Sequence, residues 1–500
     1  MADLLSNLTI ALSAQNLFFI VIGTVIGIVA GALPGFTPTM GIAIMIPITY
    51  TLNPATGLIF LGAIYCGAMY GGSISAILIN TPGTSAAAAT AIDGYKMTLN
   101  GRAHEALKEA SVASFWGGII SVLALIFLAP PLAKFAFEFG PQERFMMALF
   151  GLTIIASLST KSVLKGLIAG CVGLIFACVG MDPILGKSRF TFGSSFLMGG
   201  INIIPAVIGL FSISQIFTVL MDPIEKMDKD SIAHFKSAKV RLKDIVMYPI
   251  VYIRSAIIGI IIGIIPGTGG DVASYVSYNT GKMLSKDGDK FGTGSREGVA
   301  CCEAANNAVT GGTLIPTLTL GVPGNTTTAV LLGGLTIHGL VPGYGLFTSQ
   351  KPVTYPFIYA LFLANLVILF IGLFGAKHFA MVTLTPGNIL SGSVLMLSVV
   401  GSYAIRGNPN DVIVMLFFGL IGFLFKCYKY NSVPIVLGLI LGPIAEEGLS
   451  QALLLNKNSL TQTLLSILTR PICLVLMLFM IISIIYPYLM ERRSKLKLEQ

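Results

Sequence analysis

Charged residues are scarce in this chain: Asp, Glu, Lys and Arg make up 11% of its 500 residues, and hydrophobic residues make up 54%. A soluble protein of this length would carry about 25% charged residues. The composition therefore excludes a soluble globular domain and indicates a polytopic membrane protein. The apolar runs are too numerous for a cleaved signal peptide to explain, and no positively charged segment precedes the first of them.

Residues that hold metals or perform catalysis are also few. There are four histidines and seven cysteines, and the cysteines form no CxxC pair. An odd number of cysteines spread through apolar runs gives neither a disulfide framework nor a metal site. The zinc-protease, serine-hydrolase, Walker and dinucleotide-binding motifs are absent too. We therefore expect no enzyme, no cofactor and no tightly bound metal.

Basic residues are missing from the start of the chain, where no Lys or Arg occurs before Lys96. The net charge of +9 does not indicate a nucleic-acid partner, because the basic residues sit in short loops and form no basic domain. Basic loops at 93–110, 222–244 and 282–296 and the tail 491–500 are cytoplasmic by the lysine and arginine bias.

Pro-Gly pairs interrupt the apolar runs in two matching sets. The first set is GALPGFT at 31–37, GGS at 71–73 and NTPGTS at 80–85, and the second is GIIPGTG at 263–269, GGT at 311–313 and GVPGNT at 321–326. Proline removes a helix hydrogen bond and glycine tolerates the turn, so each pair should break a helix. Broken backbone inside a bilayer is tolerated only where protein buries it or where it lines a cavity. Two matching sets of broken helices predict a transporter's binding site.

The basic loops also predict the path of the chain. The run at 246–280 has basic loops on both sides, so it should enter and leave on the same face, with each arm reaching roughly mid-bilayer at about 15 Å. The run at 17–50 lacks flanking basic residues, so both its ends should lie outside. The long spans at 55–92 and 299–337 carry their motifs in the same order, but a basic loop follows the first span and precedes the second. The two spans should therefore cross in opposite directions, which indicates an inverted-topology repeat.

The predicted fold is an all-α polytopic membrane protein with an inverted-topology repeat. Each half has a re-entrant hairpin, a broken transmembrane helix and additional scaffold helices. The predicted division is a first repeat at 1–221 (hairpin 17–50, broken helix 55–92, scaffold 112–220), a cytoplasmic linker at 222–244, a second repeat at 245–490 (hairpin 246–280, broken helix 299–337, scaffold 356–490) and a basic tail at 491–500. Scaffold passes are expected near 112–129, 145–158, 163–180 and 196–220, and near 356–375, 389–404, 412–425, 433–444 and 465–490.

Several long motifs carry a resemblance to a known family. They are GALPGFTPTMGIAIMIPIT, YGGSISAILINTPGTSAAAATAIDGY, IIPGTGGD, EAANNAVTGGTLIPTLTLGVPGNTTTAVLLGGL and IHGLVPG. Together they resemble the large membrane subunit of the tripartite tricarboxylate transporter family over about residues 15–490. The resemblance implies a carboxylate carrier of the bacterial inner membrane that is driven by a cation gradient. It also implies a small four-helix membrane subunit and a periplasmic solute-binding protein as partners, and it leaves open a homodimer of the complex.

Few charged residues lie in the deep segments, so a carboxylate substrate would depend on backbone groups. Each break exposes the N-terminus of the following helix, with free N–H groups and partial positive charge. Hydroxyl and amide side chains at or near the breaks add donors, and the carbonyls that end the preceding half-helices suit Na+. Each of these side chains could instead only cap its own helix. The predicted substrate residues are Thr37, Thr39, Asn80, Thr84, Ser85, Thr268, Asn306, Asn307, Asn325, Thr326 and Thr327.

A coupling site for Na+ or H+ is predicted from Pro34, Gly35, Asp271 and Glu303. An ionisable side chain inside a membrane is a functional hypothesis by default. The alternatives are that Asp271 caps the helix at 272–280 and that Glu303 lies at the cytoplasmic interface near Arg296.

Two other functional classes stay open. An intramembrane enzyme would need a nucleophile and base or a metal set, which the histidines do not provide. A channel-like or binding-protein-independent organic-anion permease would also suit apolar helices, and counterflow would distinguish a channel from a carrier. His338 and Asp93 precede glycines at matching positions of the two repeats, and the glycines are expected to end both helices there.

Overall fold

The first half of the chain is a series of helices that is interrupted at two Pro-Gly breaks. The computed structural model describes residues 2–33, 35–158, 163–182, 186–221, 242–375, 378–379, 381, 385 and 387–498. In the first half the elements are α1 (Ala2–Ala11), α2 (Ala14–Ala32), α3 (Pro38–Thr49), α4 (Pro54–Ile79), the 3-10 turn η1 (Ser85–Ala87), α5 (Ala88–Leu99), α6 (Ala103–Phe137), α7 (Pro141–Leu158), α8 (Val163–Ala177), β1 (Gly180–Met181), β2 (Ser188–Arg189), α9 (Ser195–Met198), α10 (Ile203–Ile208), the π-helical turn η2 (Gly209–Ile213) and α11 (Ser214–Met221).

The second half repeats the hairpin and the broken helix and adds more scaffold helices. Its elements are α13 (Leu242–Ile245), α14 (Pro249–Ile264), α15 (Gly269–Leu284), the 3-10 turn η3 (Gly288–Lys290), α16 (Arg296–Leu320), α17 (Thr326–Ile337), α18 (Tyr344–Phe347), α19 (Lys351–Phe374), α21 (Gly387–Ala404), α22 (Pro409–Cys427), α23 (Val433–Leu455), α24 (Leu460–Thr469) and α25 (Pro471–Leu498).

The chain is an all-α membrane protein. Within the described ranges, seven helices are long and apolar enough to cross a membrane, and the bent pair of α24 and α25 would add an eighth span. The two-residue strands β1 and β2 pair as an antiparallel hairpin. Shorter apolar helices include α3, α14 and α17, which adjoin the Pro-Gly breaks.

Each hairpin packs its first arm on the first half of a broken helix. In the first half α2 packs on α4, and in the second half α14 packs on α16. Glycines make this contact possible: a Cβ on Gly27 would lie 2.3 Å from Ile64 O, and a Cβ on Gly259 would lie 2.3 Å from Ala305 O. Small residues let helix backbones approach closely inside a membrane. The two halves therefore share an architecture, while their opposite sidedness stays a prediction.

A buried carboxylate joins the two halves near the predicted cytoplasmic face. Asp93, on α5, accepts hydrogen bonds from the backbone N–H groups of Gly292, Gly294 and Ser295 at 2.8–2.9 Å. The hydroxyl of Tyr278 donates to its other oxygen at 2.8 Å. Asp93 therefore fixes the loop that leads into α16, and the expectation that Gly94 ends the helix is wrong, because α5 continues to Leu99.

A second buried carboxylate ties α6 to both the hairpin and the broken helix of the second half. Glu109 is fully buried and accepts from Tyr252 OH at 2.7 Å and from Arg296 Nε at 2.6 Å. Lys108 pairs with Asp244 beside it. Because each buried charge has a partner of opposite sign or a hydroxyl donor, the cost of desolvation is offset.

One predicted loop and two predicted scaffold segments differ from the structure. The basic segment 93–110 is largely helical, since α5 ends at Leu99 and α6 begins at Ala103. The short run at 433–444 is part of α23, which extends to Leu455 despite Pro443. The run at 465–490 is not one straight pass, because α24 and α25 meet at 87° just before Pro471. Proline lacks the N–H that would continue a helix, which accounts for the bend.

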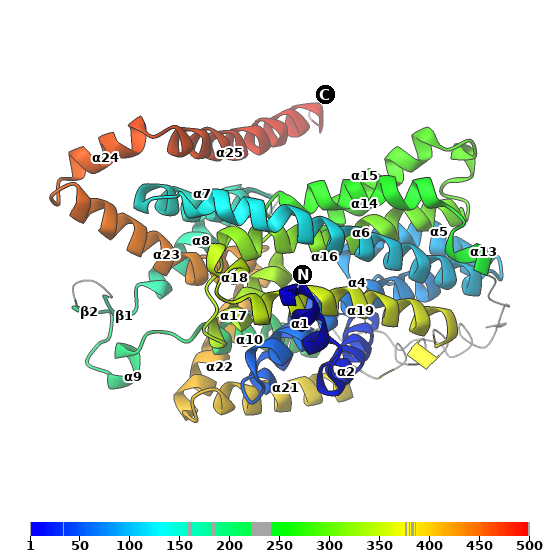
Figure 1. Ribbon diagram of the computed structural model, residues 1–500, viewed down its shortest axis with the longest axis horizontal. Helices are drawn as coiled ribbons and strands as arrows, with labels where there is room; N and C mark the ends of the chain where they lie inside the picture. Colours follow the sequence, from blue (N-terminus) through cyan, green and yellow to red (C-terminus); the bar gives the residue numbers. More distant parts are fainter. Residues whose placement is uncertain are drawn as a thin grey trace.

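Two groups of predicted loops, one from each side, lie at opposite ends of the molecule. In Figure 1, α13 and the turn after α15 lie at one end, while β1, β2 and α9 lie at the other. The first group belongs to the basic loops predicted to be cytoplasmic, and the second follows α8 on the predicted outer side. The predicted linker 222–244 lies mostly outside the described residues.

The sidedness can be tested by labelling single cysteines. Lys286 and Val341 are both exposed, and they lie in loops predicted to face the cytoplasm and the periplasm, respectively. In a background without the exposed Cys171 and Cys427, an impermeant maleimide added to spheroplasts should label Val341→Cys, because its loop should lie outside. Lys286→Cys should react only after the membrane is permeabilised. Equal labelling of both in intact spheroplasts would refute the predicted sidedness.

Candidate functional site

The four helix N-termini that follow the breaks meet around one cavity. A cavity of about 420 Å³ lies among the starts of α3, η1, α15 and α17, two from each half of the chain. We call it the tip pocket. Its lining includes nine residues predicted from the sequence: Thr37, Thr39, Thr84, Ser85, Thr268, Asp271, Asn325, Thr326 and Thr327.

Three of these side chains also cap their own helices. Thr37 Oγ1 accepts from Met40 N at 3.3 Å, Thr84 Oγ1 accepts from Ala87 N at 3.3 Å, and Asn325 Oδ1 accepts from Thr328 N at 2.9 Å. Capping therefore uses the acceptor atoms of these residues. The Asn325 amide still donates to Tyr65 OH at 2.8 Å, which holds the start of α17 against α4.

Two contacts join the halves of the chain across the pocket. The Thr39 hydroxyl lies 3.1 Å from the hydroxyls of both Thr326 and Thr327, so the tip of the first hairpin touches the second broken helix. Ser85 Oγ donates to Asp271 Oδ1 at 2.8 Å, so the first broken helix touches the second hairpin. The pocket is thus built by both halves in reciprocal fashion.

The turn of the second hairpin is held by backbone and hydroxyl groups. Gly267 N donates to Gly324 O at 2.7 Å, which joins this turn to the Pro-Gly break before α17. Thr268 Oγ1 donates to Ile262 O at 2.5 Å and lies 2.8 Å from Ile265 O, so it satisfies carbonyls at the end of α14. The helix that follows begins at Gly269, so Asp271 lies in its first turn and is not its cap residue.

The pocket carries an unusual balance of charge. No Lys or Arg lines it among the described residues, and Asp271 is the acidic residue in its lining. Exposed N–H groups and the dipoles of the helices make the N-termini favourable for an anion. A carboxylate at Asp271 would repel that anion unless a cation also binds, so the pocket suits an anion and a cation together.

Some predicted residues lie elsewhere. Asn80 is exposed, caps the end of α4 in the left-handed region (φ 54°) and does not line the pocket. Gly35 has φ 79° in the turn of the first hairpin, which only glycine adopts easily. Pro34 lies outside the described residues.

Asn306 lies directly behind the pocket. Its Nδ2 donates to Met69 O at 3.2 Å, and a Cβ on Gly270 would lie 2.7 Å from its Oδ1. Met69 and Gly270 both line the pocket. Asn306 is fully buried, and its Oδ1 has no hydrogen-bond partner. A buried acceptor without a partner is costly, and a bound cation would satisfy it.

Glu303 is deeply buried one turn from Asn306. Thr90 Oγ1 donates to its Oε1 at 2.5 Å, and Ser114 Oγ donates to its Oε2 at 3.2 Å. Asn307 Nδ2 donates to Ser114 at 2.7 Å and lies 3.4 Å from Glu303 Oε2. Glu303 is fully buried and is not at an exposed interface, and the bonds found for its carboxyl group come from neutral donors.

Four lining residues lie outside the segments at the Pro-Gly breaks and were missed by sequence reasoning: Met69, Phe211, Asn431 and Val433. Phe211 lies in η2, a π-helical turn, and single π-turns often mark functional sites. Asn431 and Val433 come from the turn between α22 and α23. Neither segment carries a Pro-Gly pair, so the pattern that located the breaks did not include them.

Comparison with known proteins gives consistent results. The family model described as "Tripartite tricarboxylate transporter TctA family" matches residues 17–437. An uncharacterized 52.8 kDa protein in the TAR-I ttuC' 3' region of Agrobacterium vitis is 36% identical over 507 residues, covering 100% of both chains. An uncharacterized protein in the TAR-II ttuC' 3' region of the same organism is 32% identical over 237 residues, covering 47% of this chain and 96% of the relative.

Proposed function

The chain belongs to the tripartite tricarboxylate transporter TctA family, and on that premise we propose that it imports a small carboxylate across the bacterial inner membrane by cation-coupled alternating access. The observation that carries this proposal is the tip pocket. Four helix N-termini from both halves meet there, and no Lys or Arg lines the pocket among the described residues. Carboxylate oxygens would accept from the free backbone N–H groups of these termini.

A second cavity supports access from the other side of the membrane. A cavity of about 320 Å³ is lined by Phe137, Val322 and Pro342, among others. Asn325, at the tip pocket, is only three residues from Val322, which is buried. The Pro-Gly break before α17 therefore lies between two cavities. Movement of this break relative to α7 and α23 would open one cavity as it closes the other.

The coupling cation is Na+ or H+, and the structure offers groups suited to each. The groups suited to Na+ are the Asp271 carboxylate and the unpartnered Asn306 Oδ1, because hard cations prefer oxygen ligands of this type. The group suited to H+ is Glu303, a buried carboxyl group that accepts hydrogen bonds from the neutral hydroxyls of Thr90 and Ser114. A cation beside a bound anion would raise the affinity for both, because the coupling between two ligands is reciprocal.

Counterflow separates a carrier from a channel, with citrate as the probe. Proteoliposomes that contain the chain and its small subunit should take up labelled citrate faster when loaded with unlabelled citrate. Asn325→Asp should slow uptake at least about tenfold. The variant keeps the cap, but it places a negative charge at the anion site and removes the amide donor there. Asn53→Asp is the matched control, because it makes the same change at the N-cap of α4, away from the pocket. Absence of trans-stimulation in the unmodified protein, or equal loss in both variants, would refute the proposal.

Titration of Na+ and pH tests the coupling. Uptake of citrate should rise with Na+ or with an inward proton gradient, since the cation offsets the charge at the site. Asp271→Asn should weaken the Na+ dependence, and Glu303→Gln should weaken the pH dependence. Asp287→Asn, in an exposed loop, provides the control. Uptake that is indifferent to both Na+ and pH would show that symport is the wrong mechanism.

Two further subunits complete the proposed assembly. The family belongs to a tripartite system, which supports a small four-helix membrane subunit and a periplasmic solute-binding protein as partners. Vesicles that hold this chain alone should therefore take up micromolar citrate slowly, and added binding protein and small subunit should restore the rate. Full uptake by the chain alone would instead favour a permease that needs no binding protein.

A further inference from the structure

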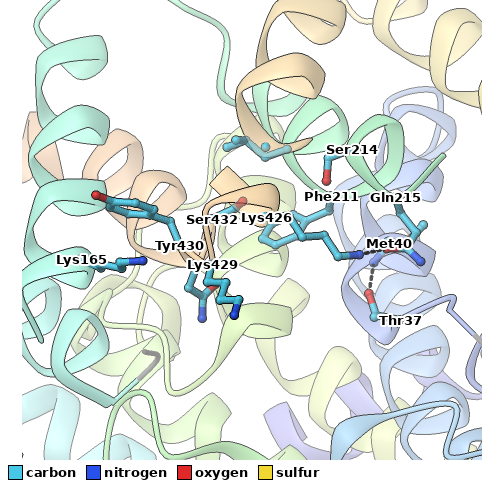
Figure 2. A pocket seen from close by; sticks show the side chains of 13 residues that line it. Thr37, Met40, Lys165, Phe211, Ser214, Gln215, Lys426, Lys429, Tyr430 and Ser432 are labelled. Atoms are coloured by element: carbon cyan, nitrogen blue, oxygen red, sulfur yellow. Dashed lines mark hydrogen bonds between the residues drawn. The ribbon is translucent and has the colours of Figure 1, made fainter. Parts of the chain in front are cut away.

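A larger cavity adjoins the tip pocket and differs from it in charge. It has a volume of about 680 Å³ and shares Thr37, Phe211 and Asn431 with the lining of the tip pocket. Three lysines line it, Lys165, Lys426 and Lys429, and its described lining includes no Asp or Glu. Figure 2 shows these lysines around the cavity, with Lys426 extending toward Gln215. We call this cavity the lysine vestibule.

The lysines come from two segments that are far apart in the sequence. Lys165 lies in the first turn of α8, and the other two lie at the end of α22 and in the turn that follows. Lys165 Nζ donates to Tyr428 O at 2.7 Å and lies 4.8 Å from the centre of the Tyr430 ring. Lys426 Nζ donates to Gln215 Oε1 at 2.8 Å. The partners of Lys165 and Lys426 are neutral, so these contacts leave the charges of the two lysines unneutralised.

Helix stability explains only one of these lysines. A cation favours the last turn of a helix and disfavours the first, so Lys426 suits its place on α22 while Lys165 does not suit its place on α8. Lys429 has φ 59°, a left-handed conformation in which glycine or asparagine would be more usual. The charge of Lys165 and the backbone conformation of Lys429 are therefore not explained by the stability of their own helix and turn.

The vestibule lies on the predicted cytoplasmic side. Counted from the basic segment before α6, two passes through α6 and α7 return the chain to the cytoplasm at the start of α8. Counted back from the basic tail, with α24 and α25 as one pass, the turn between α22 and α23 is also cytoplasmic. The bond from Lys165 to Tyr428 O brings these two segments together, so the two counts agree.

We infer that the lysine vestibule is a second carboxylate-binding station, which receives the anionic substrate from the tip pocket on its way to the cytoplasm. This inference rests on the proposed function. In the tip pocket, neutral backbone groups hold the anion beside a cation. In the vestibule, lysine ammonium groups would attract the same anion electrostatically and lower the barrier to its leaving. Tyr430, Ser432 and Asn431 add hydroxyl and amide groups to the lining.

Sided counterflow of citrate tests this station. The test variant is Lys165→Gln/Lys426→Gln/Lys429→Asn. Glutamine keeps an amide donor at the first two positions, and asparagine tolerates the left-handed conformation at the third. In vesicles of defined orientation, the half-saturating citrate concentration on the cytoplasmic side should rise about five- to tenfold, and less at high salt, because salt screens exposed charges. The value on the periplasmic side should stay within about twofold, because the tip pocket is unchanged.

Two further variants serve as controls. Lys282→Gln/Lys286→Gln/Lys290→Gln removes the same charge from a predicted cytoplasmic loop outside the vestibule, and it should leave both half-saturation values unchanged. Lys165→Arg/Lys426→Arg keeps the charge and should retain most of the cytoplasmic-side affinity, which distinguishes a charge effect from misfolding. If the vestibule variant matches the loop variant while the unmodified protein shows counterflow, the station is refuted and the proposed function stands. If the unmodified protein shows no counterflow, both are refuted.

Discussion

A helix that breaks inside a membrane leaves backbone N–H and C=O groups that lipid cannot satisfy, and the centre of this protein is organised around that constraint. The free N–H groups after the breaks are capped in part by Thr37, Thr84 and Asn325. In the turn of the second hairpin, the Thr268 hydroxyl donates to a carbonyl at the end of α14, and Gly267 N donates to Gly324 O. The starts of the four helices that follow the breaks line one cavity. The need to bury four breaks together thus accounts for the position of the candidate site.

The Pro-Gly pairs were sufficient to predict the core of the site because the breaks are local features of the sequence. Proline and glycine determine where a helix ends, and the residues just after them must lie at the start of the next helix. Nine predicted residues line the tip pocket for this reason. Asn80 does not, because the residue before a break ends its helix in the left-handed region and turns toward the exposed surface.

The features that the sequence did not predict depend on contacts between distant segments. Lys165 and Tyr428 are brought together only by the packing of α8 and the end of α22. Asp93 looked like a helix end beside a glycine, but its role comes from backbone N–H groups about two hundred residues away. The predicted segment ended at 444, beside Pro443, because proline usually ends a helix, whereas α23 continues through Pro443 to Leu455.

Asp93 has a mechanical consequence for the whole molecule. One carboxylate holds α5, which belongs to the first broken helix, to the loop that connects the second hairpin with the second broken helix. A displacement of either half must therefore pull on the other, and near the tips Ser85 and Asp271 make a second link in the same direction. In the proposed carrier, two half-sites linked in this way would open and close together. Such a carrier would resist the leak that arises when one gate moves alone, so the ion gradient would not be dissipated without cargo.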